Sequence, residues 1–412
     1  MHNWRSKEIS VEDVDVTIVG GGPVGLVLAS FLAAEGVKVV VLEKEDDVIS
    51  SPRAAVYLNW VLPDLERAGL LEGMMREGFL DRVGFTIHLG ARNEKINIPL
   101  DTLVEDGFPY PFNINMGQHI LERIGLERLA ELPNARVQFA TEVTGVADHG
   151  DHAEVTAVHD GQAQTIRSSF VVGADGARSF VRSAIGAKLD GFTWDDRFVA
   201  ANLQFDFDRL GFNPNNLYVH PTNGCVIARL DKNGLWRYTY QEDGSLPEET
   251  VSDRILDRLA ALIGPDEAKK AKVVDFNPYR MHQRVATTMR NGRILLAGDA
   301  AHITNPTGGM GLTSGLYDDI LLQEILLAIL RGDADLDALD YYATDRVEKF
   351  TQIASAGATA LKTMVFDTRD VDEQSRGLQP QREASKSPDL QRQFIAATDQ
   401  LRSEPFAARS TV

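Results

Sequence analysis

Glycines at fixed spacing near the N-terminus indicate where this chain does its chemistry. The motif Gly20-x-Gly22-x-x-Gly25 directly follows a β-branched run, 15–19, and opens a segment of helical composition. Glycines at these positions permit a tight turn, close approach of the backbone to a pyrophosphate, and tight packing of the helix on the strand. Free N–H groups at the helix N-terminus favour phosphate there. The pattern predicts a dinucleotide-binding site.

An acidic residue completes this pattern. Glu43 ends the next apolar run, 37–42, where a carboxylate can bind the ribose hydroxyls of an adenosine. The alternative is a glycine turn of any α/β protein, but such a turn needs neither the second strand nor the acid. The residues assigned to the nucleotide are Gly20, Gly22, Pro23, Val24, Gly25, Glu43 and Lys44.

Two later glycine-rich segments indicate which nucleotide binds. One reads Gly173-Ala-Asp175-Gly176-Ala-Arg178-Ser179 and continues to Arg182; the other reads Gly298-Asp299-Ala-Ala-His302 and continues to Pro306 and Gly308-Gly-Met-Gly311. They resemble the DG and GD motifs of the aromatic flavoprotein hydroxylases, typified by para-hydroxybenzoate hydroxylase. Further similar pieces are Pro52-Arg53, Gln118 before an amphipathic helix, and Leu339-x-x-Tyr342-x-x-x-Arg346. The resemblance covers about residues 14–350 and implies non-covalently bound FAD.

The resemblance assigns roles to four polar residues. Asp299 would accept hydrogen bonds from the ribityl hydroxyls of FAD; a helix cap is its alternative role. Asp175 would contact both FAD and the nicotinamide cofactor, and a turn aspartate is the alternative. Arg53 would contact a phosphate, with a solvated surface arginine as the alternative, and Gln118 would also contact FAD.

The segment after Asp299 would lie against the flavin ring. Backbone N–H groups of 308–311 would approach the ring edge, where the following helix stabilises the anionic reduced flavin. In the family Pro306 lies beside the reactive flavin carbon, which makes it a catalytic candidate, whereas His302 is interpreted as structural. Members often carry Gln-Gly-x-Asn where this chain has Met310-Gly-Leu-Thr313, so only backbone contacts are expected there. The residues assigned to FAD are Gly298, Asp299, Pro306, Gly309, Gly311 and Leu312.

The reaction that the resemblance implies is hydroxylation of an aromatic ring. Reduced FAD would react with O2 to give a C4a-hydroperoxide, which hydroxylates a small phenolic or hydroxylated N-heteroaromatic compound in a dry pocket. A second strand–GxGxxG–helix unit is absent from the sequence, so NADH or NADPH would dock transiently. Two alternatives stay open. One is another FAD redox enzyme, a reductase or an oxidative decarboxylating or dehalogenating hydroxylase; the other is a flavin-binding regulatory protein.

A strand-rich middle region, 198–241, supplies candidates for the substrate site. Aromatic residues at 236, 238 and 240 alternate, so they share one face of a strand. Arg229 could bind a substrate carboxylate through its planar guanidinium. For all candidates the alternative is packing in the sheet core, because the sequence does not set the strand register. The catalytic candidates besides Pro306 are Tyr218, His220 and Tyr238, and the substrate-binding candidates are Arg229, Trp236 and Tyr240.

The elements that must position these residues form a discontinuous domain. Strand and helix patterns around the three motifs predict a mixed α/β (α+β) fold: a Rossmann-type FAD-binding domain, an inserted β-sheet substrate domain and C-terminal helices. After Asp367 the chain turns polar to about Leu390, which predicts a surface excursion before a terminal helix. The predicted limits are 1–82, 118–190 and 286–366 for the FAD-binding domain, 83–117 and 191–285 for the substrate domain, and 367–412 for the tail.

Composition narrows the partners and the location. The net charge of -18 argues against nucleic acid and against an anionic membrane surface. Cys225 is the single cysteine, which excludes an intrachain disulfide and a multi-cysteine metal site, and no metal is expected. The polar segment 1–12 lacks the apolar core of a secretory signal, and glycines, Pro23 and Glu35 interrupt the apolar stretch 14–42. We therefore expect a cytoplasmic protein, and the resemblance favours a monomer or homodimer.

Overall fold

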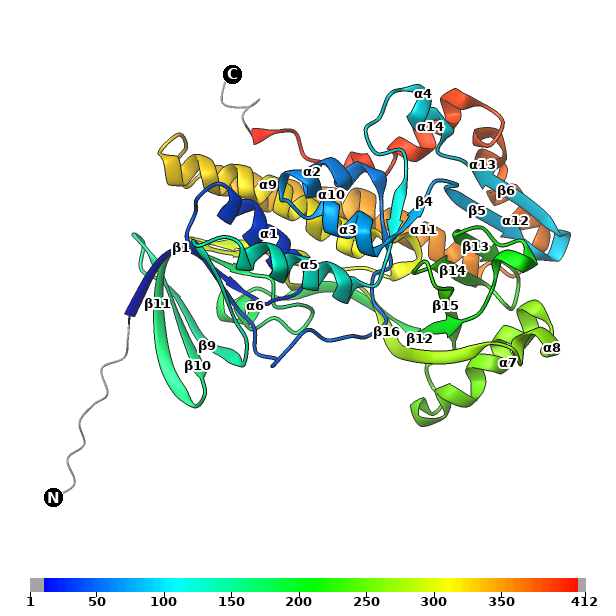
Figure 1. The fold of residues 1–412 in the computed structure, drawn as a ribbon, viewed down its shortest axis with the longest axis horizontal. Helices are drawn as coiled ribbons and strands as arrows, with labels where there is room; N and C mark the ends of the chain where they lie inside the picture. Colours follow the sequence, from blue (N-terminus) through cyan, green and yellow to red (C-terminus); the bar gives the residue numbers. More distant parts are fainter. Residues whose placement is uncertain (1–10, 407–412) are drawn as a thin grey trace.

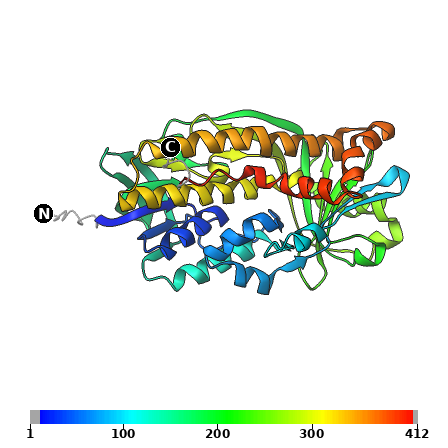
Figure 2. The same ribbon diagram turned by 90° about the horizontal axis from the view of Figure 1, so that it is seen from above.

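Two large β-sheets lie towards opposite ends of an elongated molecule, with long helices along one side (Figures 1 and 2). The computed structural model describes residues 11–406. The expectation that segment 1–12 is no secretory signal therefore falls almost entirely outside the described residues, as does the end of the predicted tail, 407–412. The mixed α/β architecture predicted from the sequence is confirmed. No helix of the described part is long and apolar enough to cross a membrane.

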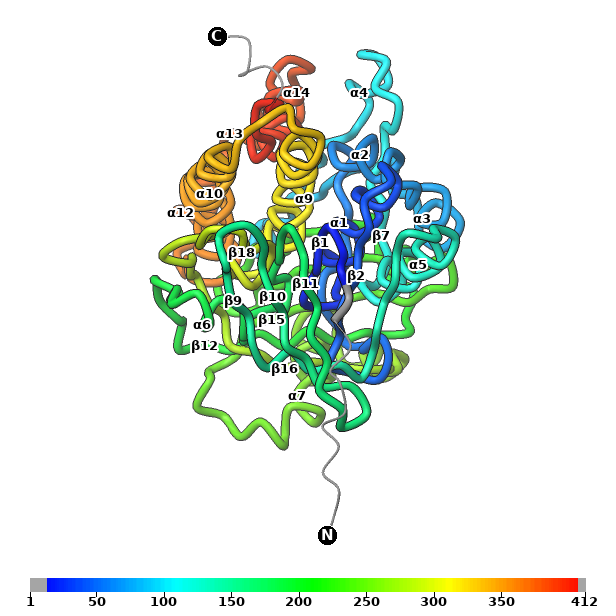
Figure 3. The backbone as a smooth tube through the Cα atoms, turned by 90° about the vertical axis from the view of Figure 1, so that its left-hand side faces the viewer, coloured from blue at the N-terminus to red at the C-terminus, as the bar shows by residue number. Residues whose placement is uncertain are grey.

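The first sheet carries the nucleotide motifs at the ends of its parallel strands. Its parallel strands run in the order β18 (Ile294–Leu296), β11 (Gln162–Gly173), β1 (Val11–Val19), β2 (Val39–Leu42) and β8 (Ala135–Gln138). The antiparallel strands are β17 (Arg290–Asn291), β9 (Thr141–Asp148) and β10 (Ala153–His159). Figure 3 shows α1 (Pro23–Ala34) and α9 (Met310–Arg331) on one side of the parallel strands and the β9–β10 hairpin on the other. Both faces are covered, which explains the near-continuous apolar runs in these strands.

The second sheet is mostly antiparallel and has two differently covered faces. Its order is β19 (His302–Ile303), β16 (Lys272–Ala286), β12 (Leu189–Gln204), β15 (Leu235–Glu242), β14 (Cys225–Arg229), β13 (Asn215–Val219), β5 (Phe85–Leu89) and β6 (Glu94–Ile98). One face packs on α7 (Val251–Ile263). On the other face Phe198 and Met281 pack with residues of the C-terminal helical run, such as Phe366. Because side chains alternate along a strand, each strand residue belongs to one face only.

A small third sheet and several short helices join the two large sheets. Its strands are β3 (Val56–Tyr57), β7 (Asn113–Asn115) and β4 (Phe79–Asp81). Buried Asp81 accepts hydrogen bonds from Asn215 Nδ2 (2.8 Å) and Asn113 Nδ2 (3.3 Å), which ties the small sheet to the second large sheet. The remaining helices of the first half are α2 (Leu62–Arg67), α3 (Leu71–Glu77), α4 (Asp101–Glu105), α5 (Gln118–Ala130) and α6 (Phe180–Ala184), with α8 (Pro265–Ala268) following α7. The 3-10 turns are η1 (Asn59–Val61), η2 (Gly90–Arg92), η3 (Asp208–Leu210), η4 (Glu248–Thr250), η5 (Gly298–Ala300) and η6 (Pro306–Gly308).

The C-terminal region is helical almost throughout. It consists of α10 (Ala338–Lys349), the π-helix η7 (Phe350–Ser355), α11 (Ala356–Lys362), the π-helix η8 (Thr363–Asp367), α12 (Val371–Gly377), α13 (Gln379–Ala384), α14 (Pro388–Ala396) and η9 (Asp399–Leu401). The polar stretch expected as a surface excursion instead forms helices whose apolar side chains, Leu378 and Ala384 among them, pack into the core, and Ile395 of the following helix packs there too. Trp60 Nε1 also donates to the Ile395 carbonyl (2.8 Å). The apolar residues are sparse but lie on the inward sides of short helices, which an average polarity hides. The domain limits stay a prediction.

Candidate active site and cofactor site

The first glycine turn places a helix N-terminus beside open space. Gly20 has a φ of +111°, and a Cβ there would lie 2.4 Å from the Ala174 carbonyl oxygen, so this position requires glycine. A Cβ at Gly25 would lie 2.1 Å from the Gly20 carbonyl oxygen, which shows how closely α1 approaches β1. A Cβ at Gly22 would meet nothing within 4 Å. The N-terminus of α1, at Pro23, thus faces unfilled space of the kind that a pyrophosphate occupies.

Polar residues from three elements surround this turn. Glu43, after β2, accepts hydrogen bonds from Gly21 N (2.7 Å) and Glu45 N (3.0 Å). Glu122 of α5 is bonded to Gln118 Nε2 (2.8 Å). Burial raises the pKa of Glu122; the Gln118 hydrogen bond and the charge of Arg53 lower it, and the charge of Glu43 raises it further. Glu43, Arg53 and Gln118, predicted as FAD residues, therefore lie near the same carboxyl group. Exposed Lys44 instead pairs with Glu45 at 3.8 Å.

Asp175 accepts hydrogen bonds from the turn that leads into α6, whose N-cap is Ser179. Its Oδ2 accepts hydrogen bonds from Phe180 N (2.7 Å) and Val181 N (3.1 Å) at the start of α6, and its Oδ1 accepts one from Ser179 Oγ (2.5 Å). The turn role given above as the alternative is thus what the contacts show, and contact with FAD and nicotinamide stays a prediction. Buried Arg182 links this motif to the next, because it donates to the Ala300 carbonyl (2.9 Å).

Asp299 stands at the end of β18 with its carboxylate unengaged. Gly298 has a φ of +59°, and a Cβ there would lie 2.9 Å from Val24 Cγ2, so the motif packs directly on α1. Within the described residues no group donates a hydrogen bond to the Asp299 side chain, so it does not act as a helix cap. The carboxylate is open to solvent on one side and surrounded by protein on the others. This partial desolvation raises the pKa of Asp299, whereas the charges of His302 and Arg53 lower it.

A buried ion cluster lies beneath this motif. Asp318 of α9 accepts hydrogen bonds from Gly298 N (2.9 Å) and Arg346 Nε (2.9 Å), and its Oδ2 lies 2.7 Å from His302 Nε2. All three side chains are fully buried. Burial would raise the pKa of Asp318, but His302 and Arg346 outweigh it and hold that pKa below its ordinary value. The His302 ring also stacks on Phe350 at 4.4 Å. His302 is therefore a structural residue that supports the Asp299 loop.

Asp319, the next residue of α9, is buried without a partner. It is fully buried, and neither of its carboxylate oxygens has a hydrogen-bond partner within residues 11–406. Burial and the neighbouring charge of Asp318 raise the pKa of Asp319 well above its ordinary value. The folded protein then keeps a proton that the unfolded chain releases above its ordinary pKa of 3.8. Stability must therefore fall as the pH rises from that value towards the folded-state pKa.

Replacing Asp319 with asparagine is expected to remove this pH dependence. Above about pH 4 the variant should have a larger free energy of unfolding than the unaltered protein. The increment between the two should grow with pH, by at most about 1.4 kcal/mol per pH unit. Urea unfolding of both apoproteins at several pH values measures the increment. Exposed Asp333→Asn on the following loop is the matched control and should show no such growth. An increment for Asp319→Asn that is constant with pH would contradict a protonated carboxyl.

The loop before α9 is held by a side chain that the sequence did not reveal. Gln283 of β16 donates from Nε2 to Thr304 Oγ1 (2.9 Å) and Ser355 Oγ (2.7 Å), and its Oε1 accepts from Asn305 N (3.3 Å). The next residue, Pro306, is exposed, and so is Gly309, which has a φ of +66° and open space beside it. Gly311 and Leu312 follow in the first turn of α9. The loop therefore leaves Pro306 and Gly309 exposed just before the N-terminus of α9. A glutamine in a strand carries no motif, so only its contacts identify it.

The six residues predicted for substrate contact lie on the side of the second sheet that faces away from the nucleotide motifs. Trp236, Tyr238 and Tyr240 are buried in the core formed with α7. Tyr218 packs against the same core, and the ring of His220 stacks near the ring of Tyr218. His220 Nδ1 accepts a hydrogen bond from Thr222 N (3.2 Å). Arg229 pairs with Asp208 at 2.7 Å. These side chains pack on the α7 side of the sheet or at strand ends, as the alternative of packing in the sheet core expects, and their contact with substrate stays a prediction. The physical reason is strand register: neighbouring residues point to opposite faces.

The opposite face of the same strands points towards the nucleotide motifs. Arg237, between Trp236 and Tyr238, donates to the Arg53 carbonyl (2.5 Å) and to Asn202 Oδ1 (2.7 Å). Burial lowers the pKa of Arg237 to about 10, so the guanidinium stays charged at neutral pH. Its charge reaches Tyr279 of β16, where burial raises the pKa of the hydroxyl and Arg237 lowers it. The sequence marks these residues only as the alternate positions to the aromatic ones.

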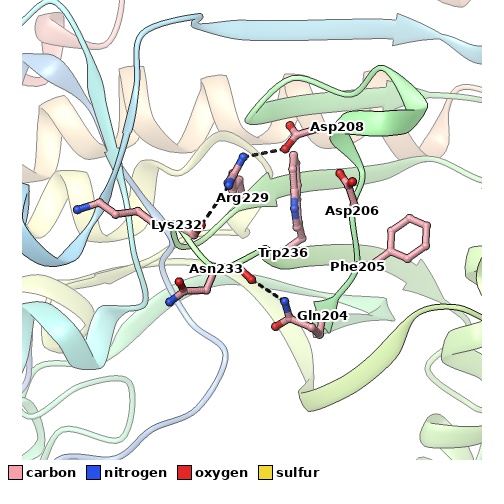
Figure 4. A pocket seen from close by; sticks show the side chains of 9 residues that line it. Gln204, Phe205, Asp206, Asp208, Arg229, Lys232, Asn233 and Trp236 are labelled. Carbon is pink, nitrogen blue, oxygen red and sulfur yellow. Dashed lines mark hydrogen bonds and ion pairs between the residues drawn. The ribbon is translucent and has the colours of Figure 1, made fainter.

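One pocket of about 500 Å³ lies at the ends of β12 and β14 and the start of β15, away from the three glycine motifs. Arg229 and Trp236 line it, together with Asp206, Asp208 and Lys232 (Figure 4). Lys232 Nζ is bonded to the Arg76 carbonyl (2.8 Å), and Arg229 is already paired with Asp208. No motif residue contributes to the lining. We therefore do not take this pocket as the place of the chemistry.

Known proteins share this arrangement. Residues 13–356 match the model of the family described as FAD binding domain. The chain is 40% identical to 6-hydroxy-3-succinoylpyridine 3-monooxygenase of Pseudomonas putida (strain DSM 28022 / S16) over 84% of this chain and 87% of that protein. It is 36% identical to para-nitrophenol 4-monooxygenase of Pseudomonas sp. (strain WBC-3) over 94% and 95%. The crystal structure of p-nitrophenol 4-monooxygenase from Pseudomonas putida DLL-E4 superimposes with a TM-score of 0.89 at 34% identity, over 95% of this chain and 99% of that one.

These matches run through all three motifs and most of the described fold. They confirm the predicted cofactor, FAD, and the predicted oxidoreductase class. The chain belongs to the FAD-dependent aromatic monooxygenases of class A, the family typified by para-hydroxybenzoate hydroxylase.

Proposed function

We propose that this enzyme hydroxylates a small phenol or hydroxypyridine at the ring carbon para to the ring hydroxyl. The names of two similar enzymes support this position: 6-hydroxy-3-succinoylpyridine 3-monooxygenase and para-nitrophenol 4-monooxygenase. In both names the oxygenated carbon is para to a hydroxyl and itself bears a substituent that contains oxygen, succinoyl or nitro. One oxygen atom of O2 bonds to this carbon as its bond to the substituent breaks, so that 4-nitrophenol would release nitrite and leave a quinone. The other oxygen atom leaves as water, and NADH or NADPH supplies the two electrons. The cytoplasmic location and the monomeric or homodimeric state remain predictions.

FAD, when bound, supplies the redox chemistry that activates dioxygen. The residues of this chain that would hold FAD are those gathered around the glycine turn and Asp299. Open space beside Gly22 and Gly309, and the unengaged carboxylate of Asp299, fit such a cofactor. The bonds of Gln283 to Thr304 and Asn305 limit the movement of the loop that carries Pro306, and this order supports our assignment of Pro306 to the flavin ring.

The observation that carries the substrate proposal is the buried cation Arg237. Two of its guanidinium nitrogens bond to Arg53 and Asn202, and the described residues offer no partner to Nη2. A buried cation with an unused donor favours an anionic oxygen, such as a phenolate or a nitro or carboxyl group on the ring. Tyr279, whose hydroxyl also has no bonding partner in the described part, stands near enough to feel this charge. We assign Arg237 to the polar end of the substrate and Tyr279 to its orientation.

The proposal is tested by following NADH and NADPH oxidation with three nitrophenol isomers. 4-Nitrophenol should accelerate oxidation, with nitrite and an oxygenated ring as products, whereas 2- and 3-nitrophenol should give weaker or uncoupled oxidation with hydrogen peroxide. A set of para-substituted hydroxypyridines then ranks the ring types. Equal turnover of all three isomers would contradict para selectivity. Oxidation that no aromatic compound stimulates would favour a reductase or a regulatory protein.

Replacing Arg237 with glutamine is expected to raise KM for the aromatic substrate about 10- to 100-fold, because a charge-assisted hydrogen bond of about 1.5–3 kcal/mol is lost. Arg237→Lys should recover part of that loss. Arg229→Gln is the matched control: it removes the same group from the face covered by α7 and should leave KM within about twofold. FAD content, read from absorbance, shows whether the Arg53 segment kept the cofactor. Equal effects of the two arginine variants would contradict the assignment of the pocket to the Arg237 face.

A further inference from the structure

The β9–β10 hairpin brings three metal-ligating side chains to one of its faces. Ala147 pairs with Glu154, Asp148 pairs with Ala153, and His149 N donates to the His152 carbonyl (2.8 Å). In an antiparallel pair, residues directly opposite lie on the same face, and so do residues two apart along a strand. His149, His152 and Glu154 therefore share a face. One ligand atom from each lies within 4.8 Å of the others.

The loop that carries these residues is fixed by bonds outside the cluster. Asp148 accepts hydrogen bonds from Gly150 N (2.8 Å) and from Arg293 N (3.2 Å). Arg293 Nε in turn donates to the Gly150 carbonyl (2.7 Å). The loop is thereby attached to the turn before β18. Since the backbone is already ordered, a ligand need restrict only the three side chains.

Neighbouring charges leave the cluster available to a cation. Asp151 Oδ1 lies 2.6 Å from His152 Nδ1. In metal sites a carboxylate in this position orients the imidazole and leaves its other ring nitrogen for the ion. Arg167 lies opposite Glu154 in the register but pairs with Asp151 (3.7 Å) and Asp13 (4.0 Å). The two imidazole rings stack at 4.8 Å with an angle of 18°, so the two side chains lie side by side on the hairpin.

We propose that His149, His152 and Glu154 bind a divalent transition ion of the Zn²⁺ class. Two imidazoles, a carboxylate and a water form a tetrahedral set that suits Zn²⁺ and that Cu²⁺ and Ni²⁺ also accept. Bonds of about 2.0–2.2 Å require ligand atoms about 3.3–3.6 Å apart. Rotation of the exposed His149 side chain supplies the remaining approach. The site is distinct from the nucleotide site, because the hairpin loop contacts the start of β18 and Asp299 follows its end.

Zinc titration of the chelator-treated, FAD-loaded full chain tests this site. Isothermal calorimetry should show one saturable site in the unaltered protein and none in the variant with His149→Ala and His152→Ala. Asp151→Asn should weaken binding by about tenfold. His159→Ala, at the other end of the same hairpin, is the matched control and should bind as the unaltered protein does.

A second readout separates specific ligation from scattered surface binding. Cu²⁺ bound to the unaltered protein should give an electron paramagnetic resonance spectrum with coupling to two ring nitrogens, and the double variant should lack that coupling. Retained flavin absorbance in each variant shows that the fold is intact. Equal zinc affinity in the double variant and the unaltered protein, or no saturable binding in either, would overturn the proposal. None of these outcomes depends on the substrate of the enzyme.

Discussion

Replacing Arg346 with methionine is expected to lower the free energy of unfolding by about 3–5 kcal/mol, because it leaves Asp318 as a buried charge without its arginine partner. Arg346 Nε donates to Asp318 Oδ1 (2.9 Å), and both side chains are fully buried. Arg346 also donates to the Leu401 carbonyl (2.6 Å), so the C-terminal segment should loosen too. Urea unfolding of the apoprotein, followed by circular dichroism, measures the loss.

Helix α9, which carries Asp318, offers a matched control for this loss. Arg331→Met breaks an ion pair with Glu35 whose N–O distance, 2.7 Å, is similar to that of the Arg346–Asp318 pair. Both side chains of the Arg331–Glu35 pair are half exposed. Exposed pairs contribute about 0–1 kcal/mol, so this variant should stay close to the unaltered protein. The double variant with Arg346→Met and Asp318→Asn should lose less than the two single changes added together. A loss from Arg346→Met no larger than that from Arg331→Met would show that burial of the cluster does not govern its strength.

Replacing Asp299 with alanine is expected to raise the dissociation constant for FAD about 100- to 1000-fold. The carboxylate is the unengaged acidic group at the end of β18, and loss of two hydrogen bonds to a charged group corresponds to about 3–4 kcal/mol. Fluorescence titration of the apoprotein with FAD measures the change. Substrate-stimulated NAD(P)H oxidation should disappear unless FAD is added in large excess.

Two controls separate loss of the cofactor from loss of the fold. The Asp299→Ala apoprotein should unfold at no lower urea concentration than the unaltered apoprotein, because no described group donates a hydrogen bond to this side chain and its desolvation disfavours the ionised carboxylate. Asp337→Ala, an exposed aspartate at the start of α10, should leave FAD affinity unchanged. Full FAD affinity in Asp299→Ala would mean that the ribityl chain is held elsewhere, and the site would have to be rebuilt around Glu43 and Arg53.

The nucleotide unit could be predicted from the sequence because its determinants are local. Gly20, Gly25 and Gly298 are required by contacts with backbone or side chains in adjacent elements, and two of them adopt positive φ angles that favour glycine. Glu43 and Asp299 each follow a short apolar run that becomes a buried strand. A turn, a strand end and a helix start each occupy a few consecutive residues, so spacing alone predicted them. The predicted helix starts at Pro23 and Gln118 agree with the structure for the same reason.

What only the tertiary structure decided is which face of the second sheet meets the nucleotide site. The alternation of aromatic residues predicted that Trp236 and Tyr238 share a face, but either face could have been the one that packs on a helix. The position of α7 settled it, and Arg237 became the residue of interest. Gln283 and the Asp318–Arg346 pair join segments distant in sequence, so no local pattern contained them. Local spacing determines backbone geometry, whereas burial and pairing depend on which segments the folded chain brings together.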